Sequence, residues 1–141
     1  MKLEVKKLTA DAMMPTRAHS DDAGMDLYAA EDRVLITGEQ RAIKTGIALS
    51  IPVGYAGLIW DKSGIALKAG LKTMGGVIDA SYRGEVGVLL INLTNEPYRV
   101  EKGAKIAQLL IQKIELPEIV EVDELDKTLR GTGGFGSTGI K

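Results

Sequence analysis

The chain has 141 residues, of which 45% are hydrophobic and 26% are charged, and its formal net charge is −1. These values are ordinary for a soluble globular protein, and the length allows one domain with a real core. The charge balance does not point to nucleic acid or an anionic membrane, and the absence of cysteine and the single histidine, His19, exclude disulfides, cysteine nucleophiles and cysteine- or histidine-rich zinc sites.

Alternating patterns and short apolar runs, separated by Gly, Asp and Pro, predict a chain made mainly of β-strands. In chain order we expect strands at residues 3–8, 25–29, 33–36, 41–51, 57–60, 85–92, 98–100, 105–114 and 119–122. Strands at this spacing, with turn residues between them, favour a sandwich or barrel over alternating βαβ units.

Helix signals are scarce. Residues 63–68 suit one or two helical turns with Ser63 near the N-terminal cap. Residues 121–129 carry charges at helical spacing, but the same pattern suits a solvated connector. No apolar run reaches membrane-spanning length, and the first residues lack the apolar centre of a signal peptide, so a cytoplasmic location is the simplest interpretation.

The composition changes at Arg130, where the segment RGTGGFGSTG begins. Five of its ten residues are glycine, and it holds the only phenylalanine, Phe135. Ordering such a segment carries a high entropic cost, so it stays mobile unless something holds it. Arg130 offers a fork of donors suited to phosphate, and Phe135 offers a flat face suited to a nucleic base. The general alternative for a Gly/Ser-rich tail is disorder without a function.

Five segments occur in a fixed order along the chain: AGMDLYAA at 23–30, DKSGIA at 61–66, GVIDASYRGE at 76–85, GAKIAQL at 103–109 and RGTGGFGSTG at 130–139. Together they resemble the five motifs of the trimeric dUTP pyrophosphatases (dUTPases). The resemblance implies an all-β jelly roll or distorted barrel that forms a homotrimer, with a β domain at 1–129 and a mobile active-site tail at 130–141. It also implies hydrolysis of dUTP to dUMP and diphosphate with Mg²⁺, which limits uracil incorporation into DNA and supplies dUMP for dTTP synthesis.

The third segment places an acid, Asp79, three residues before an aromatic ring, Tyr82. The Gly75-Gly76 pair and Gly84 indicate a tight hairpin whose backbone groups suit the edge of a pyrimidine. The resemblance implies that Tyr82 packs on the deoxyribose and that Asp79 is the general base, a role worth about 10²–10⁴-fold. The alternative is an ordinary turn with a solvated acid. The substrate-binding residues expected around the base are Thr73, Gly76, Val77 and Ile78.

The second segment is expected to hold the phosphates, because backbone N–H groups at a helix start bind anions. The resemblance implies contacts from Lys62, Ser63 and Gly64. Many family members have Pro-Arg where this chain has Asp61-Lys62, and Lys keeps the charge but loses bidentate geometry.

The remaining segments supply an amide, a carboxylate and the tail. Gln108 lies in an apolar strand, where an unpaired amide is costly; it is either a phosphate contact, as the resemblance implies, or a satisfied structural amide. The resemblance implies that Asp26 holds Mg²⁺ through water, since Mg²⁺ prefers phosphate oxygens and water, while a structural Asp in a turn is an equal alternative. The tail residues expected to close over the nucleotide are Arg130, Phe135, Gly136, Ser137 and Thr138.

The resemblance further implies that each site is shared, with one subunit giving the second and fourth motifs, another the hairpin and a third the tail. Three rivals are weighed. A dCTP deaminase has a catalytic Glu ten residues after the hairpin acid, where this chain has Leu89. A nucleotide sensor without turnover would have little need for Asp79, Tyr82 and the whole tail. A structural jelly roll, such as a coat or lectin domain, leaves the tail's Arg, Phe and hydroxyls unexplained.

Overall fold

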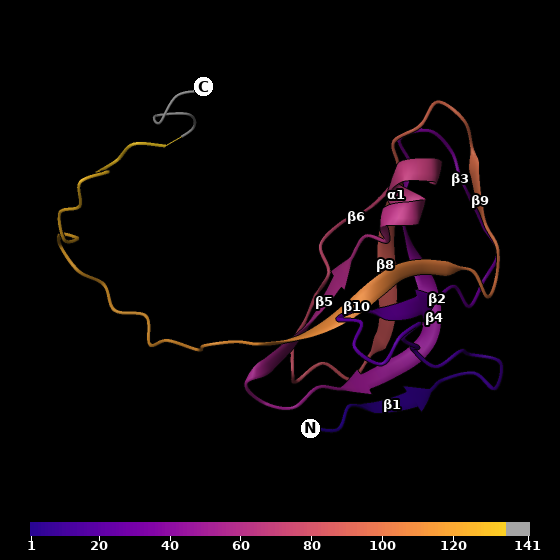
Figure 1. The fold of residues 1–141 in the computed structure, drawn as a ribbon, viewed down its shortest axis with the longest axis horizontal. Coiled ribbons are helices and arrows are strands. Elements are labelled where there is room, and N and C mark those ends of the chain that lie inside the picture. Colours follow the sequence, from indigo (N-terminus) through magenta and orange to yellow (C-terminus); the bar gives the residue numbers. More distant parts are fainter. Residues whose placement is uncertain (135–141) are drawn as a thin grey trace.

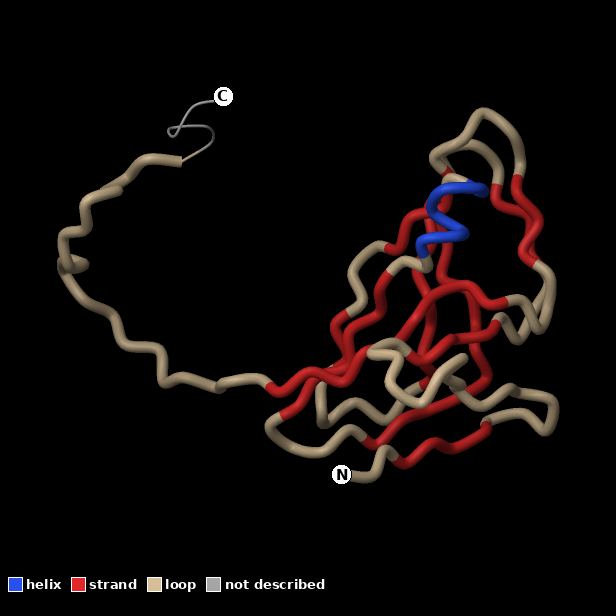
Figure 2. The backbone as a smooth tube through the Cα atoms, in the orientation of Figure 1, coloured by secondary structure: helices blue, strands red, loops and turns tan. Residues whose placement is uncertain are grey.

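The computed structural model describes residues 1–134, and its regular secondary structure is almost entirely antiparallel strand (Figures 1 and 2). The strands are β1 (Glu4–Lys7), β2 (Met25–Tyr28), β3 (Arg33–Leu35), β4 (Gln40–Ser50), β5 (Tyr55–Trp60), β6 (Leu71–Thr73), β7 (Val77–Ile78), β8 (Glu85–Asn92), β9 (Tyr98–Val100) and β10 (Lys105–Lys113), and the helix is α1 (Ser63–Ala69). Within these residues no helix is long and apolar enough to cross a membrane.

Two four-stranded sheets form the body. One has the order β1-β4-β8-β6 and the other the order β2-β10-β5-β7, while β3 and β9 pair separately. Because many of these neighbours are far apart in sequence, the chain crosses repeatedly between the sheets. The predicted all-β, jelly-roll fold class is confirmed.

The core lies between the two sheets and follows from the alternation of side chains along the strands. In β8, Val86, Val88 and Leu90 are buried while the residues between them are more exposed. Leu27 of β2 and Leu109 of β10 belong to the same buried cluster. Each such side chain contributes about 1.5–3 kcal/mol by leaving water, so the body supplies most of the stability.

The chain leaves this body at the end of β10. Residues 114–134 form an extended arm without helix or strand that runs away from the sheets (Figure 1). The strand predicted at 119–122 is therefore wrong, and 121–129 is a solvated connector rather than a helix. Ile119, Leu125 and Leu129 are almost fully exposed on this arm. Within residues 1–134 these apolar side chains therefore belong to neither a strand nor the core.

Candidate functional site

The chain segment that connects β6 to β8 lines a pocket. The pairing ends at Thr73↔Leu90, and Met74 N then donates to Leu89 O at 2.9 Å. Further on, β7 pairs with β5 in the other sheet rather than with β8. The predicted tight hairpin is thus wrong: its two arms separate and enclose a space of about 300 Å³. We call this space the hairpin pocket; its lining includes Ile59, residues 74–79, Tyr82, residues 85–87 and Leu89.

Gly76 sets the shape of one wall of the hairpin pocket. Its φ is 103°, and a Cβ there would lie 2.8 Å from the carbonyl oxygen of Ile59. The Gly76 carbonyl accepts a hydrogen bond from Ile59 N at 2.7 Å. Only glycine therefore lets the backbone at this position approach β5 so closely. Val77 and Ile78 follow in β7, an edge strand whose second edge has no strand neighbour among the described residues.

Asp79 and Tyr82 lie on the turn that follows. Tyr82 N donates to Asp79 O at 3.1 Å, and the Tyr82 hydroxyl donates to Glu85 O at 3.0 Å. A Cβ at Gly84 would lie 2.3 Å from the Tyr82 hydroxyl oxygen, so any larger residue there would displace the Tyr82 ring. Asp79 and Tyr82 are both exposed side chains that line the hairpin pocket, and a solvent molecule can reach the Asp79 carboxylate there.

Asp26 is the buried carboxylate of a second pocket. It is 6% exposed on β2, and its two oxygens accept hydrogen bonds from the ammonium groups of Lys62 and of Lys105, the latter at 2.7 Å. Burial acts to raise the pKa of Asp26, but the hydrogen bonds from Lys105 and Lys62 outweigh it, and the pKa lies below its usual value. The same contact raises the pKa of Lys105. Asp26 is therefore an ionised carboxylate held between two cations.

Strand register brings Gln108 into this pocket. Gln108 of β10 lies opposite Asp26 on one side and opposite Trp60 of β5 on the other. Its Nε2 donates to Asp61 O at 2.7 Å, and a Cβ at Gly24 would meet its Oε1 at 2.1 Å. One N–H of the Gln108 amide is thus used within the chain. The space, which we call the charged pocket, has about 300 Å³ and is lined by Ala18, Asp22, Ala23, Gly24, Asp26, Lys62 and Gln108.

The charged pocket also tests the fit of Mg²⁺. Within residues 1–134, no three His, Asp or Glu side chains gather closely enough to hold a metal ion. Asp26 offers one carboxylate, and ammonium groups already contact both of its oxygens. Such a donor set fits Mg²⁺ when phosphate oxygens and water provide most of the ligands and Asp26 acts through water.

Ser63 and Gly64 lie exposed at the start of α1, next to the charged pocket in sequence. The N-cap is Lys62 rather than Ser63, and no side chain caps the helix. Trp60 at the end of β5 is 56% exposed, so it is not a core residue.

Thr73 is buried and bonded to a residue that the sequence analysis did not select. Its backbone N and its hydroxyl donate to Asp61 Oδ1 at 2.6 and 2.7 Å. Together with Gly76 and Val77 it also borders a smaller pocket of about 220 Å³. The sequence predicted no role for Asp61 or Lys105. Asp61 directly follows β5 and Lys105 begins β10, so the signal for each was a charged residue next to an apolar stretch within a motif.

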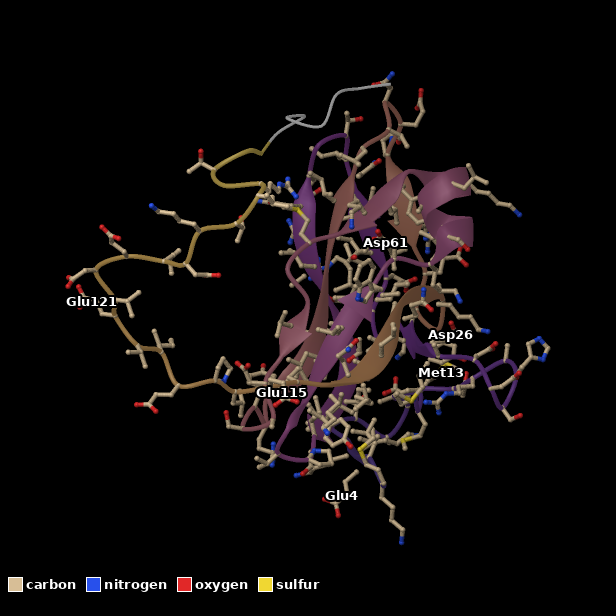
Figure 3. The ribbon with its side chains drawn as sticks, turned by 60° about the vertical axis from the view of Figure 1, so that its left-hand side comes forward. Glu4, Met13, Asp26, Asp61, Glu115 and Glu121 are labelled. Atoms are coloured by element: carbon tan, nitrogen blue, oxygen red, sulfur yellow. The ribbon has the colours of Figure 1, made fainter. Side chains whose placement is uncertain are left out.

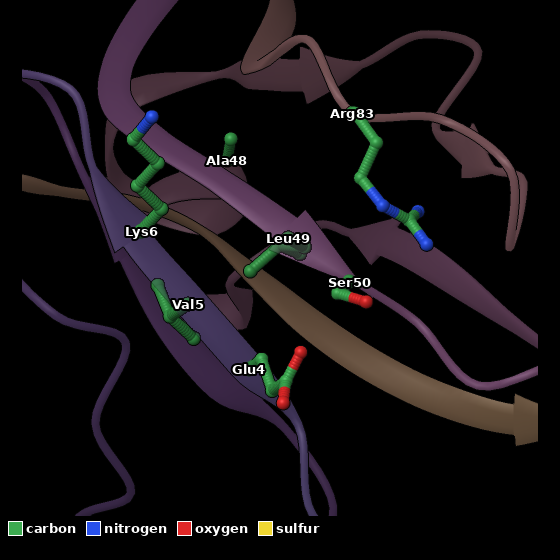
Figure 4. Close-up of a pocket in the computed structure, with 7 residues that line it drawn as sticks. All are labelled: Glu4, Val5, Lys6, Ala48, Leu49, Ser50 and Arg83. Atoms are coloured by element: carbon green, nitrogen blue, oxygen red, sulfur yellow. The ribbon is translucent and has the colours of Figure 1, made fainter.

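A single chain does not bring all the predicted residues together. Arg130 lies on the extended arm, where its Nε donates to Gly133 O at 2.8 Å. Phe135, Gly136, Ser137 and Thr138 lie outside the described residues. A further pocket of about 350 Å³ lies between β1 and β4 beside Arg83, and it contains none of the predicted site residues (Figure 4).

The chain is similar to known proteins in sequence and in structure. The family model described as dUTPase matches residues 10–139. The deoxyuridine 5'-triphosphate nucleotidohydrolase of Mycolicibacterium gilvum is 48% identical, over 97% of this chain and 94% of the relative. The protein of the same name from Corynebacterium glutamicum is 46% identical, with the same coverage.

Two solved structures have a similar fold. A mutant of the dUTPase of Staphylococcus bacteriophage 80alpha, with dUpNHpp, is 37% identical with a TM-score of 0.93, over 99% of both chains. A mutant dUTPase from phage phi11 of S. aureus, described with a structural Mg(II) ion, is 35% identical with a TM-score of 0.83, over 88% of this chain and 98% of that chain.

Proposed function

The chain belongs to the dUTPase family, and on that premise we propose that it hydrolyses dUTP to dUMP and diphosphate. The observation that carries the proposal is the division of the predicted residues between two pockets of different character. The hairpin pocket is formed largely by backbone and apolar groups and carries the exposed Asp79 carboxylate. The charged pocket holds the Lys62 ammonium and the Gln108 amide. A nucleoside triphosphate has the same two parts, a flat base with its sugar and a polyanionic chain.

The hairpin pocket would take the base and sugar. The free edge of β7 presents backbone donors and acceptors of Val77 and Ile78, which suit the hydrogen-bonding edge of uracil. Gly76 and Thr73 shape the adjoining backbone. Tyr82, fixed through its hydroxyl on Glu85 O, would pack against the deoxyribose and leave no room for a 2′-hydroxyl.

Asp79 would act as the general base. It accepts a proton from a water molecule whose oxygen forms a bond to the α-phosphorus. The bond from the α-phosphorus to the bridging oxygen breaks, and diphosphate leaves with that oxygen. The exposure of the Asp79 side chain in the hairpin pocket supports this role, because both water and nucleotide can reach it.

The charged pocket would hold the phosphates through Lys62, Ser63, Gly64 and Gln108. Because Lys105 also contacts Asp26, Asp26 keeps a cationic partner when Lys62 turns toward a phosphate. Asp26 would hold a water of the metal, and bound Mg²⁺ would neutralise charge on the phosphate oxygens.

The complete site would need a homotrimer. Six large apolar residues of the arm are exposed, and an apolar arm that stays exposed within residues 1–134 favours docking on another subunit. The exposed apolar residues of the arm are Leu116, Ile119, Val120, Val122, Leu125 and Leu129.

This arrangement leaves a body at 1–129 and an active-site tail at 130–141, whose Arg130, Phe135, Gly136, Ser137 and Thr138 would close over nucleotide bound by other subunits. In the cell, the reaction would limit uracil incorporation into DNA and supply dUMP for dTTP synthesis. The cytoplasmic location stays a prediction from the sequence.

An assay of diphosphate release tests the proposal. With Mg²⁺ the protein should release diphosphate from dUTP, with little release from UTP, and chelation of the metal should reduce the rate strongly. A protein that leaves dUTP intact would refute the proposed function. Release of ammonia from dCTP would instead favour the deaminase alternative.

A further inference from the structure

The turn that carries Lys62 receives little support from the helix that follows it. Helix α1 has seven residues, no side chain caps its first turn, and only Ile65 and Ala69 pack, partly buried, against the core. An isolated helix of this length is not stable in water. Contacts from outside α1 must therefore fix the turn at Asp61 and Lys62.

Asp61 provides those contacts with its carboxylate. Oδ1 accepts hydrogen bonds from Thr73 N and from the Thr73 hydroxyl, at 2.6 and 2.7 Å, and Oδ2 accepts one from Lys72 Nζ at 2.7 Å. Thr73 and Lys72 belong to β6, which is paired with β8, so the donors are held by a sheet. Burial acts to raise the pKa of Asp61, but the hydrogen bonds from Lys72 and Thr73 outweigh it, and the net pKa is lowered.

The backbone of Asp61 makes the connection to the charged pocket. Its carbonyl accepts a hydrogen bond from Gln108 Nε2 at 2.7 Å, and the next residue, Lys62, contacts Asp26. In Figure 3 Asp61 is labelled above Asp26. The hydrogen bonds of the Asp61 carboxylate therefore hold the backbone that carries Lys62 against β6.

We propose that Asp61 is a positioning residue, which anchors the turn to β6 and thereby holds Lys62 and Gln108 in the geometry that binds the phosphates. The inference rests on the proposed function. It assigns Asp61 to the phosphate side alone, so its loss should affect the binding of phosphate groups and leave recognition of base and sugar intact.

The test uses the full-length Asp61→Ala and Asp61→Asn variants with Mg²⁺. In Asp61→Ala, kcat/KM for dUTP should fall roughly 10- to 100-fold, because small misplacements of binding groups have large effects on rate. The affinity for a non-hydrolysable dUTP analogue should fall by a similar factor, while the inhibition constant of deoxyuridine, which lacks phosphates, should stay unchanged. Asp61→Asn keeps an acceptor for Thr73 and should recover most of the activity.

A matched control is Asp11→Ala, which removes an exposed ion pair with Lys102. Neither residue lines the hairpin pocket or the charged pocket. It should leave both affinities unchanged. If Asp61→Ala does not fold, Lys72→Met removes one donor to Asp61 and should weaken the binding of the analogue by a smaller factor in the same direction. Equal losses for the analogue and deoxyuridine, or variants that behave like Asp11→Ala, would overturn the proposal. A wild-type protein without dUTP hydrolysis would instead refute the proposed function.

Discussion

The two pockets are built in different ways from the same strands. The hairpin pocket owes its shape to backbone: two glycines in special positions, a two-residue edge strand and a turn closed by main-chain hydrogen bonds. The charged pocket owes its shape to side chains, with Asp26 between Lys62 and Lys105 and an amide that bridges to Asp61. Backbone geometry is insensitive to pH and salt, whereas charged contacts are not. Substitutions in the two pockets should therefore fail in different ways.

Asp79→Asn should give the largest effect. The variant keeps the shape of the side chain but cannot accept the proton of the attacking water, so turnover should fall by about 10²–10⁴-fold or more. Binding of dUTP should remain near that of the wild type. Single-turnover kinetics and a binding titration measure the two quantities, and near-normal turnover would remove Asp79 from the role of base.

Gly76→Ala tests the claim that backbone shapes the hairpin pocket. A methyl group there meets the Ile59 carbonyl oxygen at 2.8 Å, and φ is 103°. The substitution should therefore reduce the stability of this backbone conformation by about 1–3 kcal/mol and displace the backbone around residue 76. KM for dUTP should rise strongly. Gly75→Ala is the control, since φ is 64° there and a Cβ meets nothing within 4 Å. Equal kinetics for the two variants would argue against a backbone-defined pocket.

Tyr82→Ala should change selectivity more than rate. Without the ring, space opens beside the sugar, and the preference for dUTP over UTP should fall by roughly tenfold or more. Competition between the two nucleotides measures this ratio. Tyr82→Phe keeps the ring and loses only the bond to Glu85 O, so it should retain most of the selectivity. An unchanged ratio in Tyr82→Ala would exclude packing on the sugar.

Lowering the pH should weaken the ion pairs of the charged pocket and reduce the free energy of unfolding by a small amount. The folded pKa of Asp26 lies below the unfolded value of about 3.9, so its ionised form contributes stability above about pH 4. That contribution is lost as the pH falls through the folded pKa. Thermal unfolding between about pH 5 and 2 should therefore show a steeper decline in the wild type than in Asp26→Asn. Parallel curves would mean that the two ammonium groups do not stabilise the carboxylate.

The sequence was sufficient for most of the body because alternation and turn residues are local signals. It missed β6 and β7, which have three and two residues and too few positions for a pattern. The pair Gly75-Gly76 indicated a turn but not its partner, so the crossover from one sheet to the other was not foreseen. The apolar residues at 119–122 look like a strand, yet they lie on the arm.

The candidate site was predicted to a similar degree. Asp26, Lys62 and Gln108 do meet in one pocket, as do Gly76, Asp79 and Tyr82 in another. The contacts of Asp61 and Lys105 join strands that are distant in sequence, and no local pattern specifies them. The separation of the two pockets on one chain is equally non-local. It leads to the claim that base and phosphates of one nucleotide are bound by different subunits.

Mixing two defective proteins tests that claim most directly. Asp79→Asn and Lys62→Met each damage a different pocket, and each alone should show little dUTP hydrolysis. After co-refolding as mixed trimers, random assembly should place an intact hairpin pocket beside an intact charged pocket in about a quarter of the sites. Diphosphate release should then rise to about a quarter of the wild-type rate, whereas a mixture no more active than the sum of its parts would contradict a site shared between subunits.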